Sequence, residues 1–584
     1  MTSEDNSELR KIIQKIALLN AIRYNGKAQA GPVMRKLLGE KSEYRTEIKE
    51  LSAVIDKVIL EINNLSLDEQ TQIVATKWPE ILMKQKIREE KRLPPLPNAD
   101  AYTLVVTRYA PNPNCVLHLG SARAIVLCHE YARMYKGKFV LRFEDTDPEV
   151  KRPVLEFYDQ IREDLAWLQC KPDEEYIQTD RMSIYYKYAE KLLESGDAYV
   201  CTCPSEQFRK RQLVNQPCEC RNLPIEEHVV RWQRMFDSTY REGEAVVRVK
   251  TDLNHPNPAV RDWPAARVKD IEKYPHPRVG IEYRVWPLYN LACGIDDHLM
   301  GVTHIIRGKE HLTNQVRQEY MYKHLGWKYP EAIHFGRLKI TGAYLSKSKI
   351  VQAIGEGLYK DWDDPRLATL TCLRRRGITP IAIKKMMFDL GPKTSDITLS
   401  WENLYAFNRK IVDPASNRYF FVPNPKKLKV KRIPKVFLAR LHLHPDKSER
   451  GSREYTIEPK GRDNCAVFWF SKNDLGALKL RNEIRLMGLF NVRVEKINTD
   501  SAQGTFASES YEEARNANAQ MIHWVPVGEE ISGQVVMPDA TLVKGIFERS
   551  CNQLKPNDTI QLERFGFVRI DRVDHNLTAY YTHK

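Results

Sequence analysis

The sequence lacks both a long hydrophobic run and the cysteine content of a disulfide-stapled protein. No stretch of about 18 or more apolar residues occurs in the chain, so no transmembrane helix is predicted. The first residues, Met-Thr-Ser-Glu-Asp-Asn-Ser-Glu, lack the basic and apolar regions of a secretion signal. The 11 cysteines are few for 584 residues and odd in number, which favours reduced thiols or a metal site. We therefore expect a cytoplasmic protein.

Basic residues outnumber acidic ones, and this excess points to a polyanionic partner. Lysine and arginine number 91 and aspartate and glutamate 76, which leaves a formal net charge of +15. A positive field attracts polyanions and speeds their encounter, so nucleic acid is the first partner to consider. A basic surface that serves only solubility is the alternative, because net charge indicates partners rather than fold.

Hydrophobic periodicity divides the chain into regions of different secondary structure. Helical spacing of apolar residues and the linker Pro94–Pro97 predict a helical appendage over residues 1–100. From residue 101, strands alternate with helices, which predicts right-handed βαβ units and a parallel sheet with ligands at its carboxyl end. Residues 179–288, with cysteine pairs and many prolines, interrupt this alternation as an insertion. Short apolar runs between turn residues predict β-barrels or sandwiches over residues 411–584.

A loop between a predicted strand and a predicted helix, residues 108–121, offers a site for an anion. It contains neither a G-x-x-x-x-G-K-[ST] nor a G-x-G-x-x-G pattern. Instead it places His118 and Gly120 at a helix N-terminus, where free amides favour an anion and glycine allows close approach to the backbone. Taken alone, His118 is most simply a helix cap.

A second polar segment, Tyr344-Leu-Ser-Lys-Ser-Lys349, follows the strand-like residues 337–340. Its two lysines and two serines suit a charge clamp on a leaving pyrophosphate. Taken alone, it is most simply a solvated surface loop. Considered with the first loop, it indicates a nucleotide site built from two distant segments.

Together, the two segments resemble the signatures of class I aminoacyl-tRNA synthetases. His118-Leu-Gly-Ser121 resembles the HIGH signature, and Leu345-Ser-Lys-Ser348 resembles KMSKS. Two positions depart from the signatures: Ser121 replaces the last histidine of HIGH, and Tyr344 replaces the first lysine of KMSKS, so Lys347 becomes the main candidate for charge neutralisation. Further blocks, dense between residues 102 and 422, resemble the glutamyl/glutaminyl branch: Thr107–Pro113, Leu141–Pro148, Asp296–His304, Asp361–Arg366 and Leu373–Ile378.

The resemblance implies a multidomain α/β protein. A Rossmann-like parallel-sheet catalytic domain would lie in two halves, residues 101–178 and 289–340, around an inserted acceptor-stem-binding domain, residues 179–288. A KMSKS-like loop and helical connector, residues 341–410, would lead to anticodon-binding β-barrels in residues 411–584. This β-rich end looks like the archaeal/eukaryotic type of glutamyl-tRNA synthetase, because bacterial glutamyl enzymes have a helical anticodon-binding region.

The chemistry that the resemblance implies has two steps. ATP, with Mg²⁺ as phosphate counter-charge, and an amino acid give an aminoacyl-adenylate and pyrophosphate. A terminal ribose hydroxyl of tRNA then attacks the activated carbonyl, so catalysis rests on positioning and charge stabilisation rather than on a protein nucleophile. The expected catalytic residues are His118, Gly120 and Lys347. The expected ATP-binding residues are His118, Gly120, Ser121, Arg337, Leu338, Ser346, Lys347 and Lys349.

The same resemblance assigns the amino-acid pocket and favours glutamate over glutamine. Arg108 carries a planar fork that suits a γ-carboxylate, although glutaminyl enzymes keep this arginine as well. Glu144 and Arg307 lie in blocks that look glutamyl, and Cys293 stands where glutaminyl enzymes carry histidine. Cys293 either contacts the substrate or only makes room as a small buried residue. The expected pocket residues are Arg108, Ala110, Asn112, Glu144, Tyr289, Cys293 and Arg307.

Two cysteine pairs within the insertion have the spacing of a metal site. Cys201-Thr-Cys203 and Cys218-Glu-Cys220 can supply four thiolates to a tetrahedral, structural Zn²⁺. Some members of the synthetase family that the chain resembles carry a zinc in this insertion and others do not, so four free thiols are the alternative.

A lysine stripe lies in the C-terminal region. Lys427, Lys429 and Lys431 alternate with apolar residues, which places three positive charges on one strand face. This face suits tRNA phosphates, and edge-strand lysines that block aggregation explain it equally well.

The expected partners are L-glutamate and the acceptor stem and anticodon of tRNA, with the chain acting as a monomer. If the enzyme also charges glutamine tRNA with glutamate, a tRNA-dependent amidotransferase becomes a partner. Two alternatives stay open: a glutaminyl-tRNA synthetase, and a synthetase-like tRNA-binding protein that has lost catalysis, which Tyr344 suggests.

Overall fold

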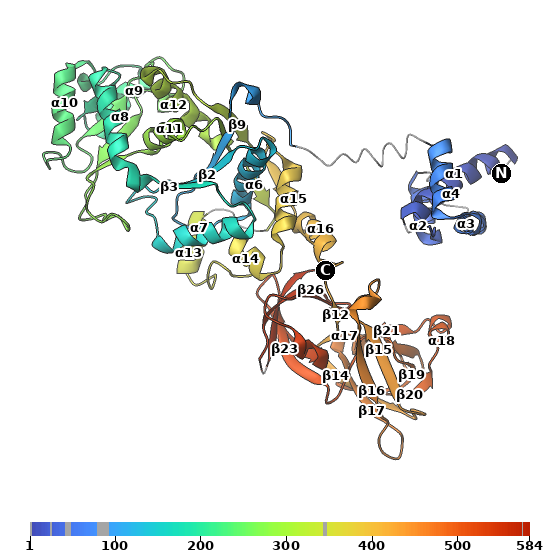
Figure 1. Ribbon diagram of the computed structural model, residues 1–584. Helices are drawn as coiled ribbons and strands as arrows, with labels where there is room; N and C mark the ends of the chain where they lie inside the picture. Colours follow the sequence, from blue (N-terminus) through green and yellow to red (C-terminus); the bar gives the residue numbers. More distant parts are fainter. Residues whose placement is uncertain (1–2, 24–25, 41–47, 79–92, 343–346, 575) are drawn as a thin grey trace. The chain divides into compact units, whose positions relative to one another are not determined.

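The computed structural model describes residues 3–23, 26–40, 48–78, 93–342, 347–574 and 576–584 of the chain. The chain forms two compact units, Met1–Arg92 and Leu93–Lys584 (Figure 1). The boundary lies before residue 100, where the sequence analysis ends the appendage, because Leu93 and Leu96 pack into the core of the second unit. Within the described residues, no helix combines the length and the apolar character needed to cross a membrane.

The described part of the first unit is helical, as its periodicity predicts. Apolar side chains at helical spacing, such as Ile13, Ile55 and Val74, are fully buried. The buried Gln70 donates from Nε2 to three backbone carbonyls at 2.8, 2.9 and 3.1 Å, which ties together the loops that precede the second and fourth helices. The helices are α1 (Ser3–Arg23), α2 (Ala30–Glu40), α3 (Ile48–Asn63) and α4 (Leu67–Lys77).

The second unit is built on a parallel sheet, which confirms the prediction from alternating strands and helices. Its strands, in spatial order, are β3 (Glu174–Ile177), β2 (Lys138–Phe143), β1 (Val106–Tyr109), β8 (His304–Gly308) and β9 (Glu331–Phe335). All the pairs between them are parallel. The chain order reverses between β1 and β8, and parallel sheets bind ligands in the crevice at such a point. That crevice lies where the loop with His118 leaves β1.

Helices pack on this sheet. The helix that follows β1 buries Ile125 and Val126 completely, in one core with Phe139 and Leu141 of β2. The helices of this part are α6 (Leu119–Met134), α7 (Leu155–Trp167), α11 (Tyr289–Leu299) and α12 (Leu312–Leu325).

A separate antiparallel sheet interrupts the parallel one between β3 and β8. Its strands, in spatial order, are β4 (Ala198–Cys201), β5 (Val246–Val249), β6 (Pro264–Val268) and β7 (Val285–Pro287). Trp263 and Trp286 are buried in a core that this sheet shares with helices α11 and α12, through residues such as Leu291 and Met321. Its helices are α8 (Met182–Glu194), α9 (Ser205–Leu213) and α10 (Ile225–Arg234).

A helical connector joins the parallel sheet to the C-terminal sheets. Leu119 donates its N–H to the Ala368 carbonyl, and Leu370 donates to the Leu117 carbonyl, both at 2.9 Å. At the other end of the short helix that follows, Arg376 donates to the Thr582 carbonyl at 3.2 Å. The connector contains β10 (Leu338–Ile340), α13 (Lys347–Gly355), α14 (Leu370–Arg375), α15 (Pro380–Leu390), β11 (Ile397–Leu399) and α16 (Trp401–Val412).

Two seven-stranded sheets and the two-stranded pair β15 (Phe437–His442) and β16 (Ser452–Ile457) make up the C-terminal region, and each seven-stranded sheet has edge strands that are neighbours in the chain. The first sheet has, in order, β12 (Arg418–Tyr419), β25 (Thr559–Leu562), β26 (Gly566–Arg572), β27 (Leu577–His583), β23 (Glu530–Val536), β24 (Leu542–Glu548) and β13 (Phe421–Pro423). The second has β21 (Gln520–Ile522), β18 (Glu483–Leu486), β19 (Asn491–Ile497), β20 (Ser501–Ser508), β14 (Pro425–Lys431), β17 (Ala466–Ser471) and β22 (Val525–Pro526). Because only one or two residues separate the edge strands, both sheets must curl into barrels, as predicted. The remaining elements are α17 (Lys472–Ala477) and α18 (Tyr511–Asn516).

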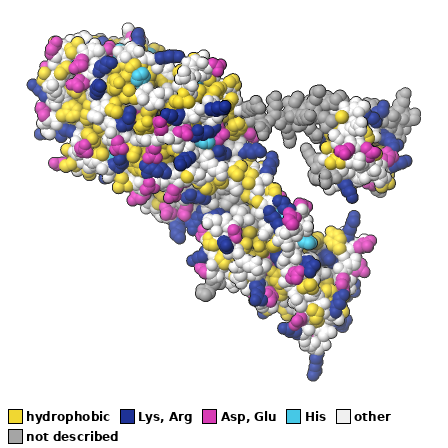
Figure 2. Space-filling view, viewed as in Figure 1, with side chains coloured by type: hydrophobic (Ala, Val, Ile, Leu, Met, Phe, Trp, Pro, Cys, Tyr) yellow, Lys and Arg dark blue, Asp and Glu magenta, His cyan; other side chains and the backbone are white. Residues whose placement is uncertain are grey.

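The lysine stripe lies on an internal strand of the second barrel. β14 pairs with β17 on one side and with β20 on the other, so the edge-strand explanation is wrong. Lys427 and Lys429 are exposed, and the Lys427 ammonium lies 5.1 Å from the centre of the Trp469 ring. Elsewhere on the face drawn in Figure 2, Lys and Arg side chains are spread among acidic ones rather than gathered in one patch.

The contact of α14 with the first barrel is tight enough to test by substitution. Gly377 has a φ of +80°, and an added Cβ would lie 2.7 Å from Thr582 Oγ1. Gly357 has a φ of +73° with open space around it. Left-handed backbone costs an alanine about 1 kcal/mol at either position, and overpacking adds about 1–3 kcal/mol at Gly377 only.

We therefore expect Gly377→Ala to lower the free energy of unfolding clearly more than Gly357→Ala, as measured by urea denaturation. Equal losses would contradict the tight contact.

Candidate active site

A cavity of about 650 Å³ opens beside the loop that joins β1 to α6. Residues 114–118 of this loop line the cavity, which places Asn114 and Cys115 beside it. Val351 and Gln352 of α13 line it as well. The lining is Tyr109, Pro111, Asn112, Asn114, Cys115, Val116, Leu117, His118, Ser121, Val150, Lys151, Val351 and Gln352.

His118 is both the cap of α6 and a wall of this cavity. Its Nδ1 accepts a hydrogen bond from the Ser121 N–H at 3.1 Å, so Nδ1 is unprotonated and the ring proton is assigned to Nε2. Burial lowers the pKa of His118, which keeps the ring neutral. The cap thus fixes a neutral tautomer whose Nε2–H is left to donate to a ligand. Gly120 lies in the first turn of the same helix.

The second nucleotide segment is described only in part. Ser346, Tyr344 and the side chain of Lys347 lie outside the described residues. Lys349 is exposed in the first turn of α13, the helix that lines the cavity with Val351.

Arg337 and Leu338 are not among the residues that line the cavity. Arg337 donates its N–H to Asp396 Oδ1 at 2.8 Å, and its carbonyl accepts from Ile397 at 2.9 Å. Their assignment to adenine stays a prediction.

A second cavity, of about 520 Å³, adjoins the first. Asn112 and Lys151 line both. Asn112 donates to the Glu144 carbonyl at 2.7 Å, and its Oδ1 is buried without a partner. The second lining is Ala110, Asn112, Glu144, Thr146, Asp147, Lys151, Gln178, Pro264, Pro287, Leu288, Tyr289, Asn290, His311, Asn314 and Arg317. Two ligands bound in these cavities would meet at Asn112 and Lys151.

Buried charges lie behind the second cavity. Arg108 donates from Nε and Nη2 to the two carboxylate oxygens of Asp297 at 3.1 and 3.3 Å. Arg142 donates to Asp297 at 2.7 Å, to Glu144 Oε1 at 2.9 Å and to the Cys293 sulfur at 3.3 Å. Burial acts to raise the pKa of Asp297, but the two guanidinium groups outweigh it and hold that pKa well below its ordinary range. Cys293 contacts these charges. Like Arg108 and Arg307, it is not among the residues that line the cavity.

Arg307 differs from the other two buried arginines, because no carboxylate among the described residues pairs with it. It donates to the Tyr329 hydroxyl at 3.0 Å, to Gln318 Oε1 at 3.3 Å and to the Tyr289 hydroxyl at 3.5 Å. Burial, followed by the Arg307 charge, lowers the pKa of His311 to about 3. The Tyr289 end of this second cavity is thus positive and able to take an anion.

Sequence reasoning missed Arg142, Lys151 and Asp297 as site residues. Arg142 lies on β2 two residues before Glu144, which directly follows the strand. A spacing of two places extended residues on one face, so this signal was available in the sequence. Asp297 stands one turn after Cys293 on α11. Lys151 carries no such signal, because only the fold brings it to the wall between two cavities.

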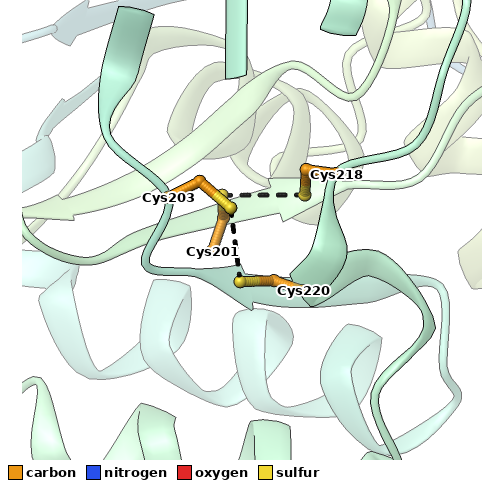
Figure 3. Close-up of side chains that lie close together, drawn as sticks. All are labelled: Cys201, Cys203, Cys218 and Cys220. Atoms are coloured by element: carbon orange, nitrogen blue, oxygen red, sulfur yellow. Dashed lines mark hydrogen bonds between the residues drawn. The ribbon is translucent and has the colours of Figure 1, made fainter. Parts of the chain in front are cut away.

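The four cysteines of the insertion converge, as Figure 3 shows. The sulfurs of Cys201 and Cys218 lie 3.8 Å apart, and those of Cys203 and Cys220 lie 3.7 Å apart. A tetrahedral site with Zn–S bonds of about 2.3 Å has sulfur–sulfur separations of about 3.8 Å. The Thr202 N–H and the Arg231 guanidinium each donate to the Cys220 sulfur at 3.4 Å, which favours a thiolate. The residues present fit a zinc ion.

Comparison with known proteins gives the same picture over the whole chain. Residues 104–414 match the family model of the catalytic domain of class I tRNA synthetases (E and Q), and residues 416–511 and 521–571 match its two anti-codon binding domains. The glutamate--tRNA ligase of Pyrococcus furiosus is 50% identical over 584 residues, covering 99% of this chain and 100% of that protein. The glutamate--tRNA ligase of Methanothermobacter thermautotrophicus is 44% identical, covering 98% and 99%. The chain therefore belongs to the class I tRNA synthetases for glutamate and glutamine, and within them to the glutamate--tRNA ligases.

Proposed function

We propose that this chain charges tRNA with L-glutamate, and that the two adjoining cavities hold ATP and glutamate. The observation that carries the site assignment is the shared wall at Asn112 and Lys151, which brings an α-phosphate and an α-carboxylate together. In the first step a glutamate carboxylate oxygen attacks the α-phosphorus and pyrophosphate leaves. In the second, a ribose hydroxyl at the tRNA 3′ end attacks the glutamyl carbonyl and AMP leaves.

The first cavity holds the nucleotide. His118 donates its Nε2–H to a phosphate oxygen, and Gly120 lets the phosphates approach the start of α6, where the helix dipole favours negative charge. Ser346, Lys347 and Lys349 complete the clamp from α13 and the segment before it. Magnesium, bound with ATP, supplies counter-charge to the phosphates.

The second cavity holds glutamate. Glu144 keeps Oε2 without a hydrogen bond to any described residue, and this oxygen accepts from the substrate ammonium. Arg307, with no acidic partner in the described chain, pairs with the α-carboxylate. Arg108 has Nη1 left over after its contacts with Asp297, and donates it to the γ-carboxylate.

The insertion binds a structural Zn²⁺ through Cys201, Cys203, Cys218 and Cys220, because four thiolates leave no open position for chemistry. The chain acts as a monomer. If it also charges glutamine tRNA with glutamate, a tRNA-dependent amidotransferase is its partner.

Charging assays test the function directly. Purified glutamate and glutamine tRNAs are each offered with each amino acid. Glutamate transfer to glutamate tRNA is expected, and glutamine transfer in its place, or no transfer to competent tRNA, would overturn the assignment.

Substitution of His118 separates its two roles. Asparagine caps a helix well but cannot extend a donor to the position of Nε2. His118→Asn is therefore expected to lower the rate of adenylate formation about 10²- to 10³-fold, as for the loss of one charge-stabilising donor, with little change in the free energy of unfolding. His118→Ala also loses the cap, at about 1 kcal/mol. Pyrophosphate exchange in the presence of tRNA and urea denaturation measure the two effects, and near-normal exchange by His118→Asn would remove the catalytic role.

Metal analysis tests the cysteine cluster. Protein purified without chelator is expected to carry about one zinc ion per chain, and Cys218→Ser to lose it together with thermal stability of the insertion. Cys465→Ser, a half-buried thiol outside the cluster, is the matched control and should retain the metal. A stable wild-type protein that carries no zinc would contradict the proposal.

A further inference from the structure

One carboxylate connects both ends of the proposed glutamate pocket. Asp297 is 1% exposed and receives hydrogen bonds from two guanidinium groups, Arg108 on β1 and Arg142 on β2. Arg108 uses Nε and Nη2 for this contact, which fixes the plane of its fork and the direction of the remaining Nη1.

The second guanidinium extends the connection to the other end of the substrate. Arg142 donates from Nη1 to Asp297 and from Nη2 to Glu144 Oε1, so a single rigid fork spans the two carboxylates. Glu144 is the group that takes the substrate ammonium in the proposed function. The position of Asp297 therefore sets the direction of Arg108 toward the γ-carboxylate and, through Arg142, the position of Glu144.

Charge around the pocket favours an anionic substrate. Among the described residues, the guanidinium groups of Arg108, Arg142 and Arg307 outnumber the carboxylates of Asp297 and Glu144 by one. The cavity lining adds Lys151 and Arg317 against Asp147, so an excess of two positive charges remains. The neighbouring Asp296 forms an ion pair with Arg181 at 2.8 Å. Glutamate carries one net negative charge and offsets part of this excess, whereas neutral glutamine offsets none of it, and an uncompensated buried cation is costly.

We propose that Asp297 is a positioning residue that sets glutamate specificity, by holding Arg108 and Arg142 in the directions that grip the two ends of the substrate. This inference rests on the proposed function and adds a residue that does not touch glutamate itself.

The isosteric variant Asp297→Asn distinguishes positioning from simple charge. It adds one net positive charge to the pocket, so a carboxylate that acted only as counter-charge would, once removed, lower KM for glutamate. Positioning predicts the opposite: a KM for glutamate raised about ten- to a hundredfold, as for the loss of a hydrogen bond between charged groups. KM for ATP should change little, and the preference for glutamate over glutamine in kcat/KM should fall about tenfold or more.

Asp296→Asn is the matched control. It removes an equally buried carboxylate from the adjacent position. Its hydrogen bonds come from Arg181, Tyr185 and Gln178, and Arg142 Nε lies 3.9 Å away, beyond hydrogen-bond distance, whereas Arg142 donates to Asp297 at 2.7 Å. Asp296→Asn should leave the ratio of KM for glutamate to KM for ATP near that of the wild type. KM does not depend on the fraction of active enzyme, so partial unfolding of either variant does not affect the comparison.

If Asp297→Asn does not fold, Arg142→Lys provides the test, because lysine keeps the charge but cannot span Asp297 and Glu144 with a planar fork. A raised KM for glutamate with an unchanged KM for ATP is again expected. Unchanged or lowered KM for glutamate in the folded variants, with a wild type that charges glutamate, would overturn the role of Asp297. A wild type that does not charge glutamate would overturn the proposed function instead.

Discussion

Compensation of buried charge is the constraint on which the catalytic part of the second unit depends. A guanidinium or carboxylate removed from water is costly unless an opposite charge and hydrogen bonds compensate it. Two adjacent carboxylates on α11 meet this need in different directions, since successive helical residues point about 100° apart. Asp297 joins β1 to β2, and Asp296 accepts from Arg181 at 2.8 Å and Tyr185 at 2.6 Å, at the start of the insertion. One turn of helix thus fixes the pocket, the sheet and the insertion relative to one another.

The nucleotide side shows how one residue can satisfy a structural and a chemical need together. His118 was most simply a helix cap by its position, and it is one. Capping uses Nδ1 as acceptor, which leaves the other nitrogen protonated and pointing away from the helix amides. The fold therefore prepares the donor before any ligand binds, as electrostatic preorganisation requires.

Local patterns in the sequence predicted most of the elements but not their neighbours. The alternation of strands and helices from residue 101 could be predicted, because an apolar run between turns, such as the one that forms β2, needs only local information. The lysines of β14 could not be assigned to an edge or an internal strand, since that depends on the parallel partner β20, far away in the chain. Motif resemblance predicted His118, Glu144 and Arg307 as site residues. It included Asp297 in the block Asp296–His304 without giving it a role and did not point to Lys151, because the contacts of both residues arise only in the folded chain.

The short helix α14 has a mechanical consequence for the two ends of the enzyme. It is six residues long, and the residues before it bond to the loop that carries His118. Arg376, directly after it, donates to the Thr582 carbonyl in β27, the last strand of the first barrel. Strands β23, β24 and β25 of this barrel lie within the residues that match an anti-codon binding domain. A helix of this length, about 9 Å, is too short to bend. Rotation of the barrel about this contact must therefore break those hydrogen bonds or displace the nucleotide loop. A change in the orientation of the barrel that keeps these hydrogen bonds therefore changes the shape of the nucleotide cavity.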